Sequence, residues 1–308
     1  MINREFLKHS LNEIICCPIC KCELKIDGDE LKWLSCFKKY QINDGILVLM
    51  AANVPTEQAD ELKLREELAS KYKNYQPEEK LKILSQYHCL PVMLIRAKDF
   101  RTKFDSIHWL LDVGCGFGWY WRNTKGDKLI LMDFALENLK SAQSFLKDEK
   151  QAILIQADAA NLPIKTQSVS GIWSVQVTQH FPDSVMKSFL SEVNRVLKDR
   201  FLIEIYNLNP AKIHMIIYRL FGKNFHTKGK LGDMLLNRLS ADELTVLWKD
   251  VKTNAKLEIG YSEMFFHPDF NLKPRFGSIT IIENILTKVP WIAHTFARQI
   301  HVEISPKL

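Results

Sequence analysis

The chain has 308 residues, of which 46% are hydrophobic and 25% charged, a composition typical of a soluble globular protein with a sizeable core. Its formal net charge of +6 is mild, so it permits nucleic acid or acidic headgroups as partners without requiring either. No apolar run reaches the roughly 18 residues that a membrane span needs, and the N-terminus lacks the apolar core of a signal peptide. We therefore expect a cytoplasmic protein without a membrane span.

The first part of the chain divides into two segments of different character. Residues 10–50 contain short apolar stretches with a turn signal at 43–45, which predicts a small β-rich ribbon. Residues 55–104 instead repeat apolar side chains at near-helical spacing among Glu and Lys. We expect a ribbon domain over residues 1–52 and a helical linker or cap over residues 53–104.

The rest of the chain alternates short apolar runs with amphipathic stretches. The runs that predict strands are 107–113, 128–132, 152–157, 171–177 and 201–206, with predicted helices at 136–147 and 184–198. Strands that alternate with helices through short loops favour a parallel sheet covered on both faces. We expect an α/β, doubly wound, Rossmann-like domain over residues 105–308, with its ligand at the carboxyl ends of the strands.

The alternation breaks after the fifth predicted strand. Two further strands are predicted at 256–261 and 300–305, and a helix with a Ser240 N-cap precedes them. The remaining stretches, about 208–238 and 262–297, are predicted to be insertions above the ligand pocket that carry acceptor specificity.

A glycine-rich loop directly follows the first predicted strand of this domain. Gly114, Gly116 and Gly118 allow a tight turn, a close approach of a ligand to the backbone and the start of the next element. A nicotinamide-type fingerprint would place its third glycine where Trp119 stands. Asp112, before the first glycine, would repel a pyrophosphate and suits a cationic amino-acid moiety. The loop therefore predicts a nucleotide-like ligand other than a dinucleotide.

Two further carboxylates follow neighbouring strands. Asp133 ends the second strand of the domain, about 20 residues past the first glycine, where a carboxylate can accept both hydroxyls of a ribose. Asp158 follows the third strand and, with the backbone amide of Ala159, would lie near the edge of a purine. These residues predict a site for an adenosine-containing ligand.

Together these residues resemble the cofactor motifs of the class I S-adenosylmethionine (SAM)-dependent methyltransferases, especially the branch that includes ubiquinone and menaquinone methyltransferases. The match covers about residues 107–206, and residues 174–183 resemble that branch's fourth motif, whose tail faces the methyl group. The resemblance implies SAM as cofactor and a seven-stranded sheet in methyltransferase order with its last strand antiparallel. The residues it assigns to SAM are Asp112, Gly114, Cys115, Gly116, Gly118, Asp133, Phe134, Asp158, Ala159 and Ser174.

The chain departs from the family pattern in two places. The usual lysine-proline-glycine-glycine turn after the fourth helix is replaced by Lys198-Asp199-Arg200, which contains no glycine. Only about nine residues separate Gly118 from the next strand, so the helix after the glycine loop is short. Both departures affect geometry more than cofactor recognition.

Methyl transfer is an in-line displacement, so positioning and exclusion of water supply most of the catalysis. His180 follows the fourth strand at the lip of the expected pocket, and its unperturbed pKa suits a general base. The alternative is that His180 only hydrogen-bonds the loop. Asp183 is expected to be an N-cap, while Glu204 or Tyr206 could line the acceptor side and His267 is a further candidate.

Five of the seven cysteines lie within the first forty residues. A secreted disulfide framework would spread them more evenly, so the cluster indicates a metal-binding module or its remnant. Cys17, Cys20 and Cys36 resemble ligands of a zinc-ribbon-like domain that occurs alone in bacteria and at the N-terminus of some methyltransferases. The fourth ligand position falls on Lys39, which cannot bind zinc while protonated. We expect a metal-free remnant, with zinc as the alternative.

Three function hypotheses follow. The first is a SAM-dependent methyltransferase acting on a small-molecule or lipid-linked acceptor, which the apolar stretch 213–221 could cover. The second is an rRNA or tRNA base methyltransferase, since a family that methylates a ribosomal guanine carries a similar cysteine ribbon. The third is a non-catalytic protein with the same fold. Intact glycines and Asp133 favour an enzyme, and the lack of a dense basic stripe disfavours RNA.

Overall fold

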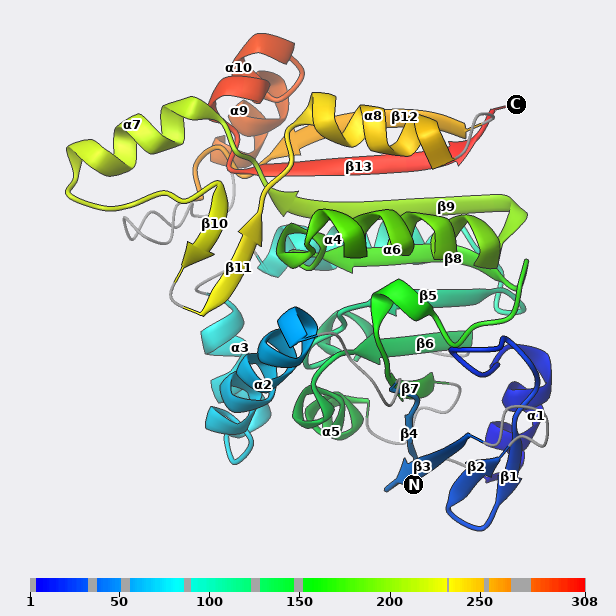
Figure 1. The fold of residues 1–308 in the computed structure, drawn as a ribbon. Helices are drawn as coiled ribbons and strands as arrows, with labels where there is room; N and C mark the ends of the chain where they lie inside the picture. The colour runs from blue at the N-terminus through cyan, green and yellow to red at the C-terminus, as the bar shows by residue number, and fades with distance from the viewer. Residues whose placement is uncertain are drawn as a thin grey trace.

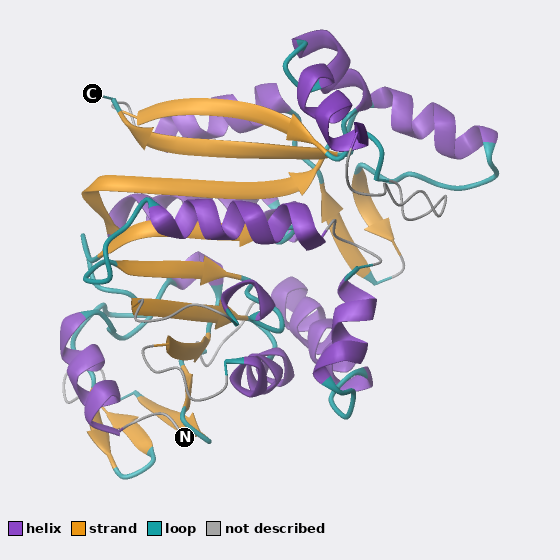
Figure 2. Ribbon diagram, turned by 180° about the vertical axis from the view of Figure 1, so that it is seen from behind, coloured by secondary structure: helices purple, strands orange, loops and turns teal. Residues whose placement is uncertain are grey.

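The computed structural model is built around one eleven-stranded sheet with helices on both faces (Figures 1 and 2). The structure describes residues 4–32, 38–50, 56–85, 90–122, 128–146, 152–231, 233–251, 255–266 and 278–307. The strand order is β1-β2-β3-β4-β7-β6-β5-β8-β9-β13-β12. No helix within these ranges is long and apolar enough to cross a membrane.

Five parallel strands form the centre of the sheet. They are β5 (Trp109–Val113), β6 (Lys128–Asp133), β7 (Ala152–Gln156), β8 (Val169–Val175) and β9 (Leu197–Leu208). Every residue of β5 and β8 is buried, as expected for strands covered on both faces. Parallel pairing of these strands brings their carboxyl ends to one edge, where the glycine loop leaves β5.

Two antiparallel strands complete one side of the sheet. β13 (Gln299–Pro306) lies between β9 and β12 (Ala255–Ser262) and runs antiparallel to both. The expectation that the last strand is antiparallel is therefore confirmed.

The expectation of seven strands is wrong, because the N-terminal ribbon extends the sheet. Its strands are β1 (Lys25–Asp27), β2 (Glu30–Lys32), β3 (Lys39–Asn43) and β4 (Ile46–Val48), and α1 (Arg4–Glu13) precedes them. β4 pairs in parallel with β7, with Leu47 opposite Ile155. Without this pairing β7 would present unpaired backbone groups at a sheet edge. The turn signal at Asp44 and Gly45 is confirmed as a hairpin with positive φ at both residues.

The helices that flank the sheet form two layers with separate cores. α6 (Asp183–Val196), α8 (Ala241–Val251) and α1 cover one face, whereas α4 (Leu90–Thr102) and α5 (Leu136–Phe145) cover the other. The predicted short helix after the glycine loop is reduced to a 3-10 turn, η1 (Trp119–Trp121). Trp121 fills the space beneath it and is buried.

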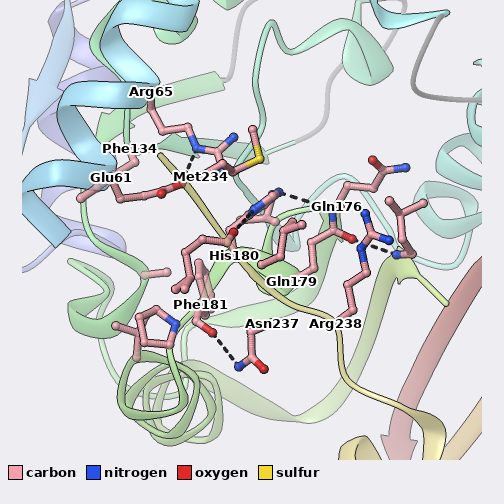
Figure 3. A pocket seen from close by; sticks show the side chains of 18 of the residues that line it. Glu61, Arg65, Phe134, Gln176, Gln179, His180, Phe181, Met234, Asn237 and Arg238 are labelled. Carbon is pink, nitrogen blue, oxygen red and sulfur yellow. Dashed lines mark hydrogen bonds and ion pairs between the residues drawn. The ribbon is translucent and has the colours of Figure 1, made fainter. Parts of the chain in front are cut away.

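The predicted insertions surround one end of the sheet. The first contains α7 (Lys212–Leu220) and a separate hairpin of β10 (Lys228–Leu231) and β11 (Met234–Asn237), part of which is drawn in Figure 3. The second contains α9 (Ser278–Leu286) and α10 (Pro290–Phe296). The predicted cap of α8 is confirmed, because Ser240 and Glu243 hydrogen-bond each other's backbone amides.

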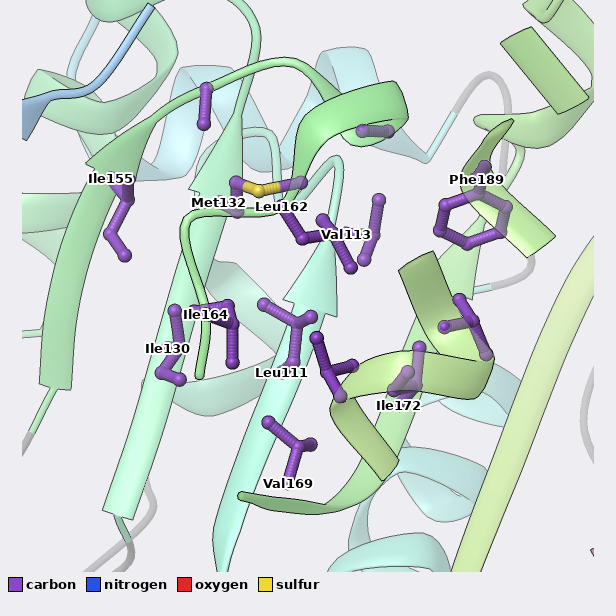
Figure 4. Close-up of a cluster of buried hydrophobic side chains, with 14 of the residues drawn as sticks. Leu111, Val113, Ile130, Met132, Ile155, Leu162, Ile164, Val169, Ile172 and Phe189 are labelled. Atoms are coloured by element: carbon purple, nitrogen blue, oxygen red, sulfur yellow. The ribbon is translucent and has the colours of Figure 1, made fainter. Parts of the chain in front are cut away.

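The core that supports the site packs α6 against the central strands (Figure 4). Leu111, Ile130 and Ile172 come from three neighbouring strands and are fully buried. Phe189 of α6 and Ile164, from the segment between β7 and β8, cover them. Because each of these side chains points to one face of its strand, the groups at the strand ends are held in fixed register.

Helix α2 (Thr56–Lys71) is tied to the sheet by a carboxylate. Its Glu66 accepts hydrogen bonds from the backbone N–H groups of Leu136 at 2.6 Å and Glu137 at 3.3 Å, the first residues of α5. The residue at the N-cap of α5, Ala135, offers no side-chain acceptor. Glu66 therefore supplies the cap from a distant segment and fixes α2 beside α5.

We predict that Glu66→Ala lowers the free energy of unfolding by about 1–2 kcal/mol, because two helix N-terminal amides lose a charged acceptor. Urea unfolding followed by circular dichroism measures the change. Glu67→Ala is the control, since Glu67 lies on the same helix with an exposed side chain. Equal stability of the two variants would contradict the capping role of Glu66.

Candidate functional site

A cavity of about 950 Å³ opens at the carboxyl ends of the parallel strands (Figure 3). Its floor is the glycine loop and the ends of β6 and β8, and its walls come from α2, the 3-10 turn η3 (Thr178–His180) and the β10–β11 hairpin. This main cavity lies at the strand ends where the ligand is predicted to bind, and residues of the first predicted insertion line it. Ligand sites of this volume lie at the large end of the range for small molecules and cofactors, roughly 300–1,000 Å³.

The glycine loop has a backbone that only glycine adopts without strain. Gly114 has φ of +73°, and a Cβ there would lie 2.2 Å from a methyl carbon of Val177. Gly116 has φ of +53°, but among the described residues no heavy atom lies within 4 Å of the position that a Cβ would occupy. Both glycines line the main cavity. Gly114 therefore serves close packing within the protein, whereas Gly116 leaves open space for a ligand to approach the backbone.

Asp133 joins the loop to the second parallel strand. Its Oδ2 accepts a hydrogen bond from Gly116 N–H at 2.8 Å, and its Oδ1 accepts from Ala135 N–H at 2.9 Å and Asn138 Nδ2 at 3.1 Å. A carboxylate offers about four acceptor positions, so these bonds to described residues leave one. Burial raises the pKa of Asp133 although the three hydrogen bonds oppose the shift. Asp133 lines the main cavity.

Asp158, Ala159 and Phe134 also line the main cavity. Oδ1 of Asp158 accepts a hydrogen bond from Ala160 N–H at 2.9 Å and so caps the short 3-10 turn η2 (Ala159–Asn161). The structure thus brings together six of the residues that the sequence assigns to the cofactor. They are Gly114, Gly116, Asp133, Phe134, Asp158 and Ala159.

The other four assigned residues are not among the described residues that line the cavity. Asp112 accepts a 2.6 Å hydrogen bond from Trp121 Nε1, and burial raises its pKa to about 7. Ser174 donates to the backbone oxygen of Val113 at 2.9 Å and so links β8 to β5. Cys115 is buried, and a side chain on Gly118 would meet Ala142. These four residues support the glycine loop through packing and hydrogen bonds within the protein. Their direct contact with a ligand stays a prediction.

His180 points into the main cavity from η3 (Figure 3). Its Nδ1 lies 2.8 Å from the backbone oxygen of Leu235, and because an oxygen of this kind only accepts, Nδ1 carries the proton. Its Nε2 lies 3.3 Å from Gln179 Nε2 and is therefore the acceptor nitrogen. Burial, aided by the nearby charges of Arg65 and Arg238, lowers the pKa of His180 to about 3. This pKa lies well below the ordinary value of histidine that suggested a general base, and the ring is neutral at physiological pH.

The remaining candidate residues have other surroundings. Asp183 lines the main cavity and accepts a 2.9 Å hydrogen bond from Asn237, but the N-cap of α6 is Pro182, so the expected cap is wrong. Glu204 accepts a 2.5 Å hydrogen bond from Tyr206, and neither is among the described residues that line the cavity. His267 lies outside the described residues.

Several cavity residues were not assigned to the site from the sequence. Arg65 comes from α2 and forms an ion pair with Glu61 at 2.6 Å. Gln176 directly follows β8 with φ of +56°, an unusual conformation for a residue other than glycine, and lines the cavity. Arg238 follows β11 and lies over the ring of Phe225 at 4.5 Å. These residues are far apart in the sequence and meet only because α2 and the first insertion fold over the same strand ends.

The N-terminal cysteines lie apart from this cavity. Cys17 is buried and its Sγ lies 3.2 Å from Tyr40 Oη, whereas Cys20 is half-buried. Burial raises the pKa of Cys16 to about 11, which disfavours the thiolate form that binds metals. Within the described ranges no group of three or more metal-ligating side chains comes together. Cys36 lies outside those ranges, so the zinc alternative stays a prediction.

Comparisons with known proteins agree with this geometry. A methyltransferase-domain family matches residues 111–202. The malonyl-[acyl-carrier protein] O-methyltransferase of Hamiltonella defensa is 37% identical over 93 residues, which are 29% of this chain and 34% of that protein. The chain thus matches about a third of the length of that relative.

Two further matches are with a solved structure and with a small protein family. A chain of the solved complex of the Haloferax volcanii Trm112 methyltransferase activator with a methyltransferase superposes with a TM-score of 0.51 at 16% identity, covering 77% of this chain and 97% of that one. A UPF0434 protein of Photobacterium profundum is 37% identical over 59 residues, 18% of this chain and all of that protein. The chain contains a segment of that family, and its central domain belongs to the class I SAM-dependent methyltransferases.

We predict that His180 makes the stability of the protein depend on pH between about 6.5 and 3. Because its pKa is lower in the folded state, the unfolded chain binds the extra proton in this window, and stability falls as the pH falls. His180→Asn should flatten the pH dependence of the unfolding free energy by up to about 1.4 kcal/mol per pH unit. Urea unfolding at several pH values measures this slope. His9→Asn, at an exposed position, should leave the slope unchanged, and an unaltered slope in His180→Asn would refute the shift.

Proposed function

We propose that this chain transfers a methyl group from SAM to a small-molecule or lipid-linked acceptor in the main cavity. The observation that carries the proposal is the convergence of Gly116, Asp133 and Asp158 on one cavity of about 950 Å³. A cavity of this size accommodates a cofactor and an acceptor side by side.

The residues present fit SAM. Gly116 leaves its side open to the cavity, the remaining acceptor position of Asp133 suits a ribose hydroxyl, and Asp158 with Ala159 would border the adenine. SAM supplies an electrophilic methyl group on a sulfonium. The charged groups of the cavity wall are of both signs, as a zwitterionic and cationic ligand requires.

The protein's own contribution is to orient the acceptor and exclude water. Helix α2, fixed by Glu66, and the β10–β11 hairpin cover the cavity. His180 presents a neutral Nε2 lone pair whose direction is set by the Nδ1 hydrogen bond to Leu235. A histidine with a pKa of about 3 removes a proton poorly, so we expect His180 to orient the acceptor's nucleophilic group for in-line attack by accepting its hydrogen bond. That bond would replace the 3.3 Å contact from Gln179 Nε2, because Nε2 of His180 has a single lone pair.

The main cavity does not favour RNA as the acceptor. Its described lining includes five Lys or Arg side chains and six Asp or Glu side chains, which is not the basic lining that a phosphate backbone needs. The basic residues are Arg65, Lys228, Lys230, Arg238 and Arg298, and the acidic residues are Asp60, Glu61, Asp133, Asp158, Asp183 and Asp233. An acceptor of low charge is therefore the better match.

Transfer of a tritiated methyl group from SAM tests the acceptor class. The protein is incubated in parallel with a cellular lipid extract, a small-molecule extract and total RNA. We expect label in the lipid or small-molecule fraction. Label in RNA alone would contradict the proposal, as would no transfer to any fraction by a protein that binds SAM.

His180→Asn should lower kcat on the labelled fraction by about tenfold to a hundredfold, because the acceptor loses its orienting group. Its affinity for SAM should stay within about twofold, since the residues that fit the cofactor are unchanged. His9→Asn is the matched control at an exposed position. An unchanged kcat in His180→Asn would show that the ring only braces the loop.

A further inference from the structure

Helix α7 turns a histidine and a tyrosine inward and exposes most of its large apolar side chains beside its basic ones. His214 and Tyr218 are buried, with 2% and 5% of their surface exposed. Leu220 and Phe221 are 78% and 68% exposed, and Ile216 on the same helix is also exposed. A helix that packed only against its own domain would face the other way, with its apolar residues in the core. The outer side of α7 is therefore suited to an apolar surface outside the chain.

Two neighbouring helices expose apolar side chains in the same way. Ile281, Ile282 and Ile285 of α9 and Trp291 and Phe296 of α10 are exposed. α10 contacts α7, and Figures 1 and 2 both show α7, α9 and α10 gathered at one corner of the molecule. We call the exposed apolar residues of these helices the apolar corner. Its members are Met215, Ile216, Leu220, Phe221, Ile281, Ile282, Ile285, Trp291 and Phe296.

A small cavity of about 280 Å³ lies within this corner. Its described lining is almost entirely apolar and comes from all three helices, including Ile217, Leu286 and Ile292. Soluble proteins rarely expose several large apolar side chains together unless a partner covers them. The small cavity therefore adjoins the apolar corner, with Phe296 common to both. A partner that covers the apolar corner would also cover this cavity.

Among the described residues, the exposed charged side chains on or beside α7 are basic. From residue 205 to residue 232 the sequence contains five Lys or Arg and no Asp or Glu. Lys212, Arg219 and Lys223 lie on or beside α7 with exposed side chains. Glu283 of α9 accepts a 2.6 Å hydrogen bond from Glu263 N–H and is thereby turned toward the protein. The apolar side chains are thus accompanied by basic ones.

We propose that the apolar corner docks on the surface of an anionic lipid bilayer. Exposed aliphatic residues and a tryptophan on short amphipathic helices, with Lys and Arg beside them, suit the boundary between acyl chains and acidic headgroups. A symmetric contact with a second copy through this surface would bring Lys212, Arg219 and Lys223 of both copies into one interface, which like-charge repulsion disfavours. The charge pattern therefore favours a lipid surface over self-association.

The position of α7 connects this surface to the main cavity. Tyr218, on the inner side of α7, lines the main cavity, whereas Leu220 on the outer side belongs to the apolar corner. A protein seated on the bilayer through this corner would hold its cavity next to the lipid. Docking on its own needs no methyl transfer. Only the consequence that the acceptor is drawn from the bilayer rests on the function proposed above.

Flotation of the full chain with vesicles tests the docking. One set of vesicles contains phosphatidylcholine alone and the other contains phosphatidylcholine mixed with phosphatidylglycerol. We expect binding to the mixed vesicles that weakens as the salt concentration rises. The variant Ile216→Ser/Leu220→Ser/Phe221→Ser should lower this binding about tenfold or more, because its apolar contacts with the bilayer are lost. Lys212→Glu/Arg219→Glu should lower binding to the mixed vesicles selectively.

The matched control is Ile107→Ser/Val246→Ser, because these side chains are as exposed as those of α7 but lie outside the apolar corner. Calorimetric titration with SAM is run on every variant and separates loss of docking from loss of the cofactor site. Failure of the wild-type chain to bind the mixed vesicles, or binding that the α7 variant retains, would overturn the proposal. So would sedimentation velocity that shows a dimer in the wild type and a monomer in the α7 variant.

Discussion

The hydrogen bond from Gly116 N–H to the carboxylate of Asp133 is the contact on which the site depends, because it joins the two strands that carry the ligand groups. The same carboxylate holds Ala135 and Asn138 at the entrance to α5. A buried carboxylate is costly in free energy unless it is hydrogen-bonded. The three hydrogen bonds of Asp133 therefore fix the glycine loop, the end of β6 and the start of α5 relative to one another. The open side of Gly116 is a consequence of this arrangement.

The cover over the cavity is held by a second carboxylate. Glu66 of α2 caps the N-terminus of α5. Because Asp133 positions α5 through Asn138, helix α2, which lines the cavity, is held in place relative to Asp133. The charges of Arg65 and Arg238, added to burial, keep His180 neutral. This environment is suited to an acceptor that is oriented by hydrogen bonding and shielded from water. It is less suited to strong general-base catalysis, which needs a pKa nearer the working pH.

The sequence was sufficient to predict the central strands, because buried parallel strands appear in it as uninterrupted apolar runs. It was also sufficient to predict the glycine loop and Asp133, because backbone conformation and the recognition of hydroxyl groups restrict the residue types at these positions. It was insufficient where the outcome depends on contacts between distant segments. The pairing of β4 with β7, the contribution of Arg65 and the outward-facing apolar side of α7 are of this kind. The low pKa of His180 likewise follows from burial beside β11 and from the charges of Arg65 and Arg238, which come from distant segments.

Calorimetric titration of SAM into the wild-type chain and into Asp133→Asn tests the central claim most directly. The asparagine keeps the shape of the side chain but removes the charge and places an N–H₂ group among donors. The wild type should bind SAM, and Asp133→Asn should bind it about tenfold or more weakly, since a hydrogen bond to a charged acceptor is lost. Absence of binding to the folded wild type at millimolar SAM, or equal affinity in the two proteins, would contradict the account.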